Sequence, residues 1–330
     1  MTQFKNAYSF MCRLRWALTF LYGLWTPGIF AEPYPVRPIR LVVPFAPGGG
    51  TEPIARLISQ KLTLSMGQQW VVDNRPGAGT TMGMEVVAKA AADGYTLLLG
   101  SVANAISATL YQRLSFDPMR DFSPITLLST TPGLLAVHPS LNVDTVKALI
   151  GLAKARPGQL AYSSAGSGTP THLAAEFFSY LTEVRLIHIP YKGGGPSVIA
   201  LLSGEAPLSF ASLPSVLPAI RSGKLKALAV TTAKRAAVLP QVPTIIESGV
   251  LGYEAETWYG LAAPAHLPND KVIRLNREVH SVLEQEEAQK FLDSVGMQLR
   301  LSTSEQYVKF TQSEIQKWHK VISFTHMRAD

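Results

Sequence analysis

Along most of this chain, short apolar runs alternate with segments in which apolar positions recur every three or four residues. Residues 39–45 form such a run, and Ile54, Leu57, Ile58 and Leu62 follow it at helical spacing. The run predicts a strand and the spacing predicts a helix. Because this order repeats along the chain, the sequence predicts βαβ units and a mostly parallel sheet.

The alternation predicts two consecutive α/β sets and a helical C-terminal region. The expected strands are residues 39–45, 70–72, 95–99, 133–137, 160–163, 186–189, 208–210, 225–230 and 256–262. The expected helices are residues 54–62, 86–91, 143–155, 172–181 and 196–203, followed by two long helical patterns. Two lobes joined by crossing strands are the architecture that we expect, with a ligand cleft between them.

The first 31 residues predict a signal peptide for export. They contain Lys5, Arg13 and Arg15 but no acid, then an apolar run over residues 16–25, and they end at Ala31. A basic start, a short apolar stretch and a small final residue are typical of a secretory signal, so we expect cleavage near Ala31. The run is shorter than the roughly 20 apolar residues of a membrane-spanning helix. An uncleaved N-terminal anchor is the alternative.

Composition and charge remove several classes of function. The chain has 330 residues and one cysteine, which excludes a disulfide framework, a thiolate zinc site and an iron–sulfur cluster. With 47% hydrophobic and 16% charged residues, the chain does not have the composition of a disordered protein. The formal net charge is +7, and residues 1–31 hold three of the basic residues, so +4 remains without them. The basic residues are dispersed, and we therefore expect no nucleic-acid partner.

A glycine-rich loop joins a predicted strand to a predicted helix in each of the two sets. The first loop is Phe-Ala-Pro-Gly-Gly-Gly-Thr at 45–51, and the second is Ser-Ser-Ala-Gly-Ser-Gly-Thr at 163–169. Each ends in a threonine at the expected helix N-cap, with Pro53 or Pro170 soon after it. Such loops direct backbone N–H groups and a helix dipole towards one point. Facing each other, the two loops would bind a carboxylate through neutral donors; ordinary tight turns are the alternative.

Other residues with possible chemistry give weaker indications. His172 is a candidate ligand contact or a solvated helix residue, and Lys192 is a candidate anion contact or a solvated loop residue. Trp258 and Tyr259 are candidates for the pocket wall, or else core or hinge-packing residues. The histidines lack zinc-site spacing, and Ser167 does not lie in a Gly-x-Ser-x-Gly sequence. We therefore expect no metal, no cofactor and no catalytic residue.

Several motifs, taken in order, resemble those of one known family. They are Pro-Ile-Arg-Leu-Val-Val-Pro-Phe-Ala-Pro-Gly-Gly-Gly-Thr at 38–51, Asp-Asn-Arg-Pro-Gly-Ala-Gly at 73–79, Asp-Gly-Tyr-Thr-Leu at 93–97, Asp-Pro-Met-Arg-Asp-Phe at 117–122, Tyr-Ser-Ser-Ala-Gly-Ser-Gly-Thr at 162–169, His-Leu at 172–173, Pro-Tyr-Lys-Gly at 190–193, Gly-Lys-Leu-Lys-Ala-Leu-Ala-Val at 223–230 and Val-Pro-Thr at 242–244. In this set, which extends over nearly the whole chain after the signal, the sequence resembles the periplasmic solute-binding proteins of tripartite tricarboxylate transporters, the Bug family.

The resemblance implies an α/β, two-lobed periplasmic binding protein of type II. Each lobe would be a mixed, mostly parallel sheet flanked by helices, with lobe 1 formed by residues 32–131 plus 257–330 and lobe 2 by residues 132–256. A monomer would close on a small organic carboxylate, held by the two glycine-rich loops, and deliver it to a membrane permease driven by an ion gradient. The expected ligand contacts are Phe45, Ala46, Pro47, Gly48, Gly49, Gly50, Thr51, Glu52, Ser101, Ser164, Ala165, Gly166, Ser167, Gly168, Thr169, His172, Lys192, Phe210, Ala211 and Trp258.

Three positions depart from the family pattern. Glu52 and Thr80 stand where the family usually has Asp and Gly, and Ala211 stands where an Asp commonly follows the residue that corresponds to Phe210. Loss of that acid favours a less polar ligand, such as an aromatic or a short mono- or dicarboxylate, over an amino acid. Whether Glu52 contacts the ligand or only caps its helix stays open.

Two other classes of function stay open beside transport. One is an enzyme that acts on a small carboxylate in the same cleft. The other is a sensor that presents its ligand to a membrane receptor.

Overall fold

The computed structural model describes residues 34–111 and 113–325. The predicted signal peptide, residues 1–31, lies outside the described residues. The described residues from Pro35 onward belong to one compact unit, which contains every element below.

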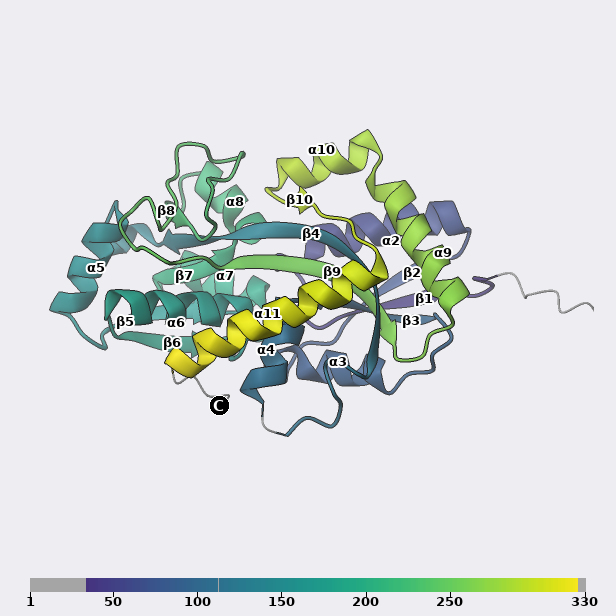
Figure 1. Ribbon diagram of the computed structural model, residues 1–330. Helices are drawn as coiled ribbons and strands as arrows, with labels where there is room; N and C mark the ends of the chain where they lie inside the picture. The colour runs from purple at the N-terminus through teal and green to yellow at the C-terminus, as the bar shows by residue number, and fades with distance from the viewer. Residues whose placement is uncertain (1–33, 112, 326–330) are drawn as a thin grey trace, which may run out of the picture. The chain divides into compact units, whose positions relative to one another are not determined.

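A ten-stranded mixed sheet runs through this unit (Figure 1). Its strands are β1 (Ile39–Val43), β2 (Trp70–Asn74), β3 (Thr96–Ser101), β4 (Phe122–Val137), β5 (Leu160–Ser164), β6 (Leu186–Pro190), β7 (Leu208–Ser212), β8 (Lys226–Val230), β9 (Glu256–Pro264) and β10 (Gln298–Leu299). The order is β2-β1-β3-β9-β4-β7-β5-β6, and β8 and β10 also pair with β4. The strand pairs β1–β2, β1–β3, β5–β6 and β5–β7 are parallel, whereas every antiparallel pair includes β4 or β9.

Strand β4 joins the two parallel groups of strands. Residues 122–132 pair with β9, and residues 133–137 pair with β7 and β8. The sequence predicted a strand only over residues 133–137, because prolines disfavour a central strand. Here Pro124 lies at a shift in register, and Pro132 is the last residue paired with β9. Both prolines therefore occupy positions where the ladder is already interrupted.

Ten helices among the described residues cover the sheet. They are α2 (Glu52–Met66), α3 (Thr81–Ala88), α4 (Val102–Leu110), α5 (Val146–Ala155), α6 (Pro170–Thr182), α7 (Gly194–Ser203), α8 (Leu213–Arg221), α9 (Asn269–Leu283), α10 (Glu286–Ser294) and α11 (Ser304–Thr325), with short 3-10 turns η2 (Ala78–Thr80) and η3 (Pro139–Leu141).

Four of these helices differ from the prediction. Helix α4 was missed because nearly all of its residues are buried, which removes amphipathic periodicity. Helix α8 was missed because it contains Pro218. Helix α3 starts five residues before the predicted helix at 86–91. The prediction did not extend back over its first turn because Gly83 lies there and glycine disfavours a helix. The C-terminal region holds three helices rather than two, because α10 separates the two that were expected.

A buried carboxylate fastens the last helix to strand β9. Glu314 on α11 accepts hydrogen bonds from the indole N–H groups of Trp258, at 2.9 Å, and Trp318, at 3.1 Å. Trp258 belongs to β9 and also packs edge-on against Tyr307 and Phe310 of α11. A charged acceptor makes such bonds about twice as strong as neutral ones. The long helix, drawn in yellow in Figure 1, is therefore held against the strand that crosses between the two parallel groups.

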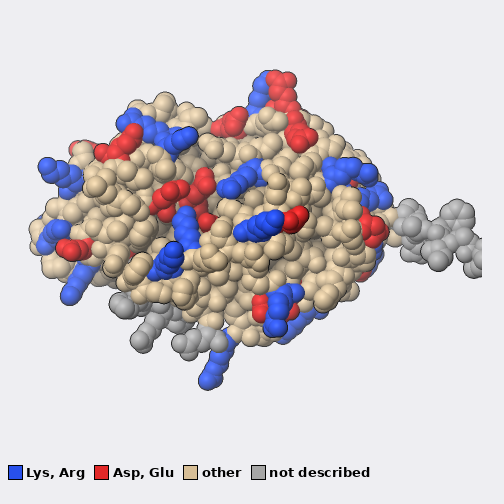
Figure 2. All heavy atoms as spheres, in the orientation of Figure 1, with Lys and Arg blue, Asp and Glu red and all other residues tan. Residues whose placement is uncertain are grey.

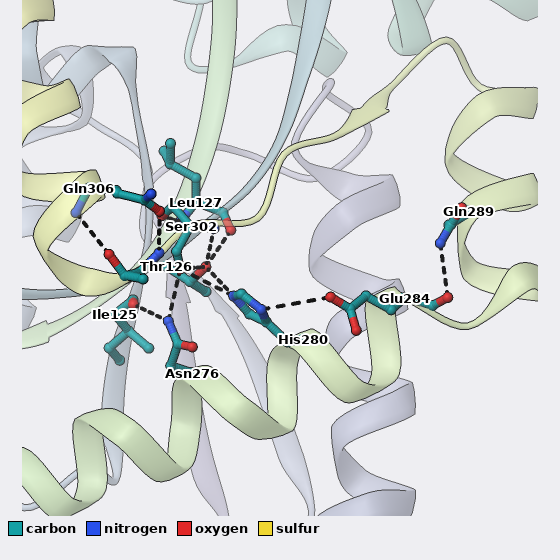
Figure 3. A network of polar contacts seen from close by, with 10 residues as sticks. Ile125, Thr126, Leu127, Asn276, His280, Glu284, Gln289, Ser302 and Gln306 are labelled. Carbon is teal, nitrogen blue, oxygen red and sulfur yellow. Dashed lines mark hydrogen bonds and ion pairs between the residues drawn. The ribbon is translucent and has the colours of Figure 1, made fainter.

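A second polar network fixes helix α9 to strand β4 and to the segment that precedes α11 (Figure 3). Asn276 on α9 donates from Nδ2 to the carbonyl oxygens of Ile125, at 2.8 Å, and Ser302, at 2.9 Å. The Thr126 hydroxyl donates to the same Ser302 carbonyl at 2.9 Å and lies 3.2 Å from Nε2 of His280. The register of β4 shifts at this point. These side chains therefore form hydrogen bonds with backbone groups that have no partner in the strand pairing.

We expect Asn276→Asp to destabilise the protein by about 3 kcal/mol, because a carboxylate would face two carbonyl oxygens and both donors would be lost. The free energy of unfolding, measured by urea titration at pH 7, tests this. Asn269→Asp is the matched control, since Asn269 is exposed in the first turn of the same helix. Equal stability of the two variants would contradict the role assigned to the network.

Candidate functional site

Two loops from different parts of the sheet meet backbone to backbone. The loop after β1 carries Gly48 and Gly49, and helix α7, which follows β6, begins with Gly194 and Gly195. A Cβ atom built on Gly194 would lie 3.0 Å from the Cα atom of Gly49, and one on Gly195 would collide with the carbonyl oxygen of Pro47. Side chains are therefore excluded at this contact. The predicted ligand contacts do not include Gly194 or Gly195.

A small cavity of about 40 Å³ lies beside this contact. We call it the hydroxyl cavity, because half of the residues that line it carry a hydroxyl group and none carries a charge. It is lined by Phe45, Gly49, Gly50, Thr51, Ser101, Ala165, Pro170, Thr171, Gly194, Ser197, Val198, Ala211, Ser212, Ser215, Thr257 and Tyr259.

Five helices begin at the hydroxyl cavity. The N-cap residues of α2, α4 and α8, which are Thr51, Ser101 and Ser212, line it directly. Pro170 at the start of α6 and Gly194 at the start of α7 line it as well. Each helix N-terminus carries unpaired N–H groups and about half a positive charge. The cavity is thus suited to an anion although no cationic side chain lines it.

Two buried hydroxyl groups in this cavity lack a hydrogen bond of normal geometry to any described residue, although the Ser212 hydroxyl interacts with that of Tyr259. The Oγ1 atom of Thr51 and the Oγ atom of Ser212 are buried and make no hydrogen bond of normal geometry within residues 34–111 and 113–325. Thr51 occupies the predicted N-cap position but its side chain does not cap α2. The Tyr259 hydroxyl lies close to that of Ser212, and burial raises the pKa of Tyr259 far above its usual value, so it stays a neutral donor. Because buried polar groups are normally paired, these hydroxyls indicate where ligand atoms would bind.

A stacked pair of histidines supports the second glycine-rich loop from behind. Nδ1 of His172 accepts a hydrogen bond from the Gly168 N–H at 3.1 Å, and its ring stacks on that of His188 at 3.9 Å. Nε2 of His188 lies 2.6 Å from the Ser164 hydroxyl, which accepts from the Gly166 N–H at 3.1 Å. Burial, and secondarily the neighbouring His188, lower the pKa of His172 to about 3. His172 is therefore a neutral acceptor near pH 7.

A second, larger cavity of about 260 Å³ adjoins the first. It shares Phe45 and Ala165 with the hydroxyl cavity, and we call it the lysine cavity after Lys192. It is lined by Pro44, Phe45, Pro76, Gly77, Ala78, Gly79, Thr80, Tyr111, Ala165, Gly166, Ser167, Pro190, Tyr191, Lys192 and Gly193.

The structure brings many of the predicted ligand contacts together around these cavities. Those that line the hydroxyl cavity are Phe45, Gly49, Gly50, Thr51, Ser101, Ala165 and Ala211. Those that line the lysine cavity are Phe45, Ala165, Gly166, Ser167 and Lys192. Those that line neither are Ala46, Pro47, Gly48, Glu52, Ser164, Gly168, Thr169, His172, Phe210 and Trp258. As ligand contacts, all of them remain predictions.

The residues that line neither cavity have other neighbours. Glu52 forms an ion pair with Arg56 one turn along α2, and the Thr169 hydroxyl donates to the Gly166 carbonyl at 2.6 Å. Trp258 lies in the core beside Glu314.

Sequence reasoning missed Thr171 and Ser212 in the wall of the hydroxyl cavity, whereas Tyr259 was a candidate for the pocket wall. Ser212 is the last residue of β7, and ligands of open α/β sheets bind at the carboxyl ends of strands. That rule, applied to every strand, would have selected Ser212.

Metal and nucleic-acid chemistry find no support in the described part of the chain. No group of three or more His, Cys, Asp or Glu side chains there is placed to hold a metal ion. On the face shown in Figure 2, Lys and Arg side chains are scattered and interspersed with Asp and Glu. No helix among the described residues has the length and apolar character needed to cross a membrane.

Comparison with known proteins gives consistent matches. The family model described as tripartite tricarboxylate transporter family receptor matches residues 54–326. Protein BugT of Bordetella pertussis is 37% identical over 299 residues, which cover 90% of this chain and 92% of BugT.

Two solved structures match in fold as well as in sequence. The structure of Rpa4515 from R. palustris with adipate has a TM-score of 0.87 and 36% identity, and covers 89% of this chain and 99% of its own. The periplasmic binding protein BugD has a TM-score of 0.86 and 30% identity, with coverage of 89% and 99%. These similarities confirm the predicted fold class, a two-lobed α/β binding protein.

We expect the His172→Asn variant to lose less stability in acid than the wild-type protein loses. Between pH 6.5 and about 3 the unfolded chain binds a proton at His172 that the folded chain does not, so the free energy of unfolding falls as the pH is lowered. Asn keeps an acceptor for the Gly168 N–H and binds no proton. The slope between pH 6 and pH 4 should decrease by up to about 1.4 kcal/mol per pH unit.

The measurement is urea unfolding at several pH values, with His319→Asn on the exposed face of α11 as the control. An unchanged slope in His172→Asn would show that His172 is not held neutral in the folded protein.

Proposed function

Because the chain belongs to the tripartite tricarboxylate transporter receptor family, we propose that it captures a small organic carboxylate outside the cytoplasm and delivers it to a membrane permease. Members of this family are solute-binding proteins rather than enzymes, which confirms the prediction that the chain is not an enzyme. The observation that carries the proposal is the pair of buried hydroxyls of Thr51 and Ser212, which lack a hydrogen bond of normal geometry to any described residue, in a cavity without charged residues.

The chemistry of the hydroxyl cavity suits a carboxylate. A carboxylate only accepts hydrogen bonds, and the cavity offers hydroxyl donors together with five helix N-termini. Hydrogen bonds from neutral donors to a charged acceptor are stronger than neutral pairs. In this proposal Thr51 and Ser212 donate to the carboxylate, and Gly49 and Gly50 bring the backbone close enough to take part.

The remaining wall of the cavity supports a ligand with an apolar body. Phe45, Val198 and Ala211 contribute apolar surface, and Ala211 is the position where the resemblance to the family implied an acid. A straight-chain or aromatic carboxylate fits this wall better than an amino acid, whose ammonium group would find no acidic partner among the cavity residues. The relative Rpa4515 was solved with adipate, so adipate is the first ligand to test.

The cellular role follows from the family. BugD is described as a periplasmic binding protein, and the predicted signal peptide at 1–31 would export this chain to the same compartment. There the loaded, closed form would dock on a permease driven by an ion gradient. A sensor protein that presents the ligand to a receptor would use the same site.

Calorimetric titration of the purified protein tests the proposal, with adipate, malate, benzoate, aspartate and glutamate as ligands. We expect adipate or another of the simple carboxylates to bind in the micromolar range or tighter, and to be recovered chemically unchanged after long incubation. Binding of amino acids alone would overturn the assigned ligand class, and conversion of a ligand would overturn the assignment as a binding protein.

We expect Thr51→Val and Ser212→Ala each to weaken adipate binding about tenfold, the cost of one hydrogen bond to a charged group. Ser59→Ala is the control, because the Ser59 hydroxyl is also buried and unpaired but lies on α2 outside both cavities. Calorimetry measures all three variants. If Ser59→Ala weakens binding as much as the other two, the loss does not come from contacts in the cavity.

We expect Gly195→Ala to weaken adipate binding at least tenfold, because its Cβ would collide with the Pro47 carbonyl and keep the two loops apart. Gly151→Ala is the control, since a Cβ atom there meets no atom within 4 Å. Circular dichroism should show both variants folded. Undiminished affinity of Gly195→Ala would show that this backbone contact is not needed for binding.

A further inference from the structure

We propose that the lysine cavity is a second anion-binding site, in which Lys192 holds a carboxylate before it enters the hydroxyl cavity. The inference rests on the proposed function, since it concerns how the ligand reaches its final position. It assigns a task to a cavity and to a charge that binding in the hydroxyl cavity does not use.

Lys192 is the one residue with a formal charge among those that line the two cavities. Its side chain is exposed, and within residues 34–111 and 113–325 it forms no ion pair or hydrogen bond. Lys61, Lys89 and Lys226, by contrast, are paired with acids. The charge of Lys192 is therefore available to an anion from solution.

Glu205, the acid bonded to the residue beside Lys192, forms no ion pair with Lys192 within residues 34–111 and 113–325. Glu205 accepts a hydrogen bond from the hydroxyl of Tyr191, the residue before Lys192, at 3.0 Å. This bond engages one oxygen of the Glu205 carboxylate. The lysine cavity itself is lined by no acidic side chain.

The two cavities are arranged as successive chambers. They share Phe45 and Ala165, so the space beside Lys192 adjoins the space beside Thr51 and Ser212. The lysine cavity, at about 260 Å³, approaches the lower end of the range of roughly 300–1,000 Å³ that is usual for sites of drug-sized ligands. A small carboxylate fits there, and Phe45, which is buried, stands between the two chambers.

One wall of the lysine cavity is held in an unfavourable conformation. Ala78, Gly79 and Thr80 form a turn in which all three residues have positive φ, at 45°, 58° and 87°. Two of these residues carry a Cβ atom, and such strain persists only where the surroundings enforce it. Here Gly79 packs directly against the Ser167 carbonyl and the Tyr111 hydroxyl, so the turn at 78–80 is fixed against the second glycine-rich loop. The contact between the turn at 78–80 and the second glycine-rich loop thus fixes this wall of the lysine cavity.

A charge at this position acts on the rate of binding more than on its final strength. Attraction by an exposed cation raises the association rate, and salt screens it. Once the carboxylate lies in the hydroxyl cavity its donors are hydroxyl and backbone groups, so the dissociation rate does not depend on Lys192.

Stopped-flow measurement of adipate binding, followed by tryptophan fluorescence, tests the inference on wild type, Lys192→Met and Lys154→Met. Lys154 is an exposed lysine at the end of α5, away from both cavities, so its removal changes the net charge equally. At low ionic strength we expect Lys192→Met to lower the association rate constant about three- to tenfold, with the dissociation rate constant unchanged. In 0.5 M NaCl the difference should nearly vanish. Lys154→Met should match wild type.

The outcomes separate this inference from the proposed function. Wild-type protein that binds none of the carboxylates in the panel overturns both. Carboxylate binding with an unchanged association rate in Lys192→Met overturns the inference alone. A faster dissociation rate with an unchanged association rate also overturns it, since Lys192 would then hold the ligand in its final position.

Discussion

The convergence of five helix N-termini on one small cavity is the constraint on which the rest of the site depends. Strands β1 and β3 run opposite to β5, β6 and β7 in the sheet, yet each of the five is followed by a helix that begins at this cavity. The positive ends of these helices supply what cationic side chains supply in other anion sites. Because that potential belongs to the backbone, the chain needs close backbone approach at this point, and its glycines at 48–50 and 193–195 provide it.

The sequence allowed prediction of those parts of the site that are contiguous in the chain. The two glycine-rich loops could be selected because local patterns mark them, and Ser101 because the family resemblance implies it. Ser212 and Thr257 could not, since nothing near them in the chain shows that they lie beside the loop after β1. Thr51 was placed correctly at an N-cap, yet its hydroxyl does not cap the helix, a difference that only the tertiary structure reveals.

The fold followed the same division between local and long-range information. Nine strands were predicted at the right places, because alternating apolar runs and glycine-containing turns are local signals. Helix α4 was not predicted, because its nearly uniform burial removes the usual periodicity. Most of strand β4 was not predicted either, because Pro124 and Pro132 interrupt its pattern. The predicted lobe boundaries at 131/132 and 256/257 remain predictions. They fall at the Pro132–Glu256 pair, where β4 exchanges β9 for β7 and β8 as its partners.

The glycine contact between the loop after β1 and the start of α7 also sets a mechanical limit. The two loops touch through backbone atoms, so no change of side-chain rotamer can widen this contact. The hydroxyl cavity then behaves as a slot of fixed width. In the function that we propose, such a slot would select ligands by the thickness of the molecule near its carboxylate and would tolerate variation in the parts that extend beyond the slot.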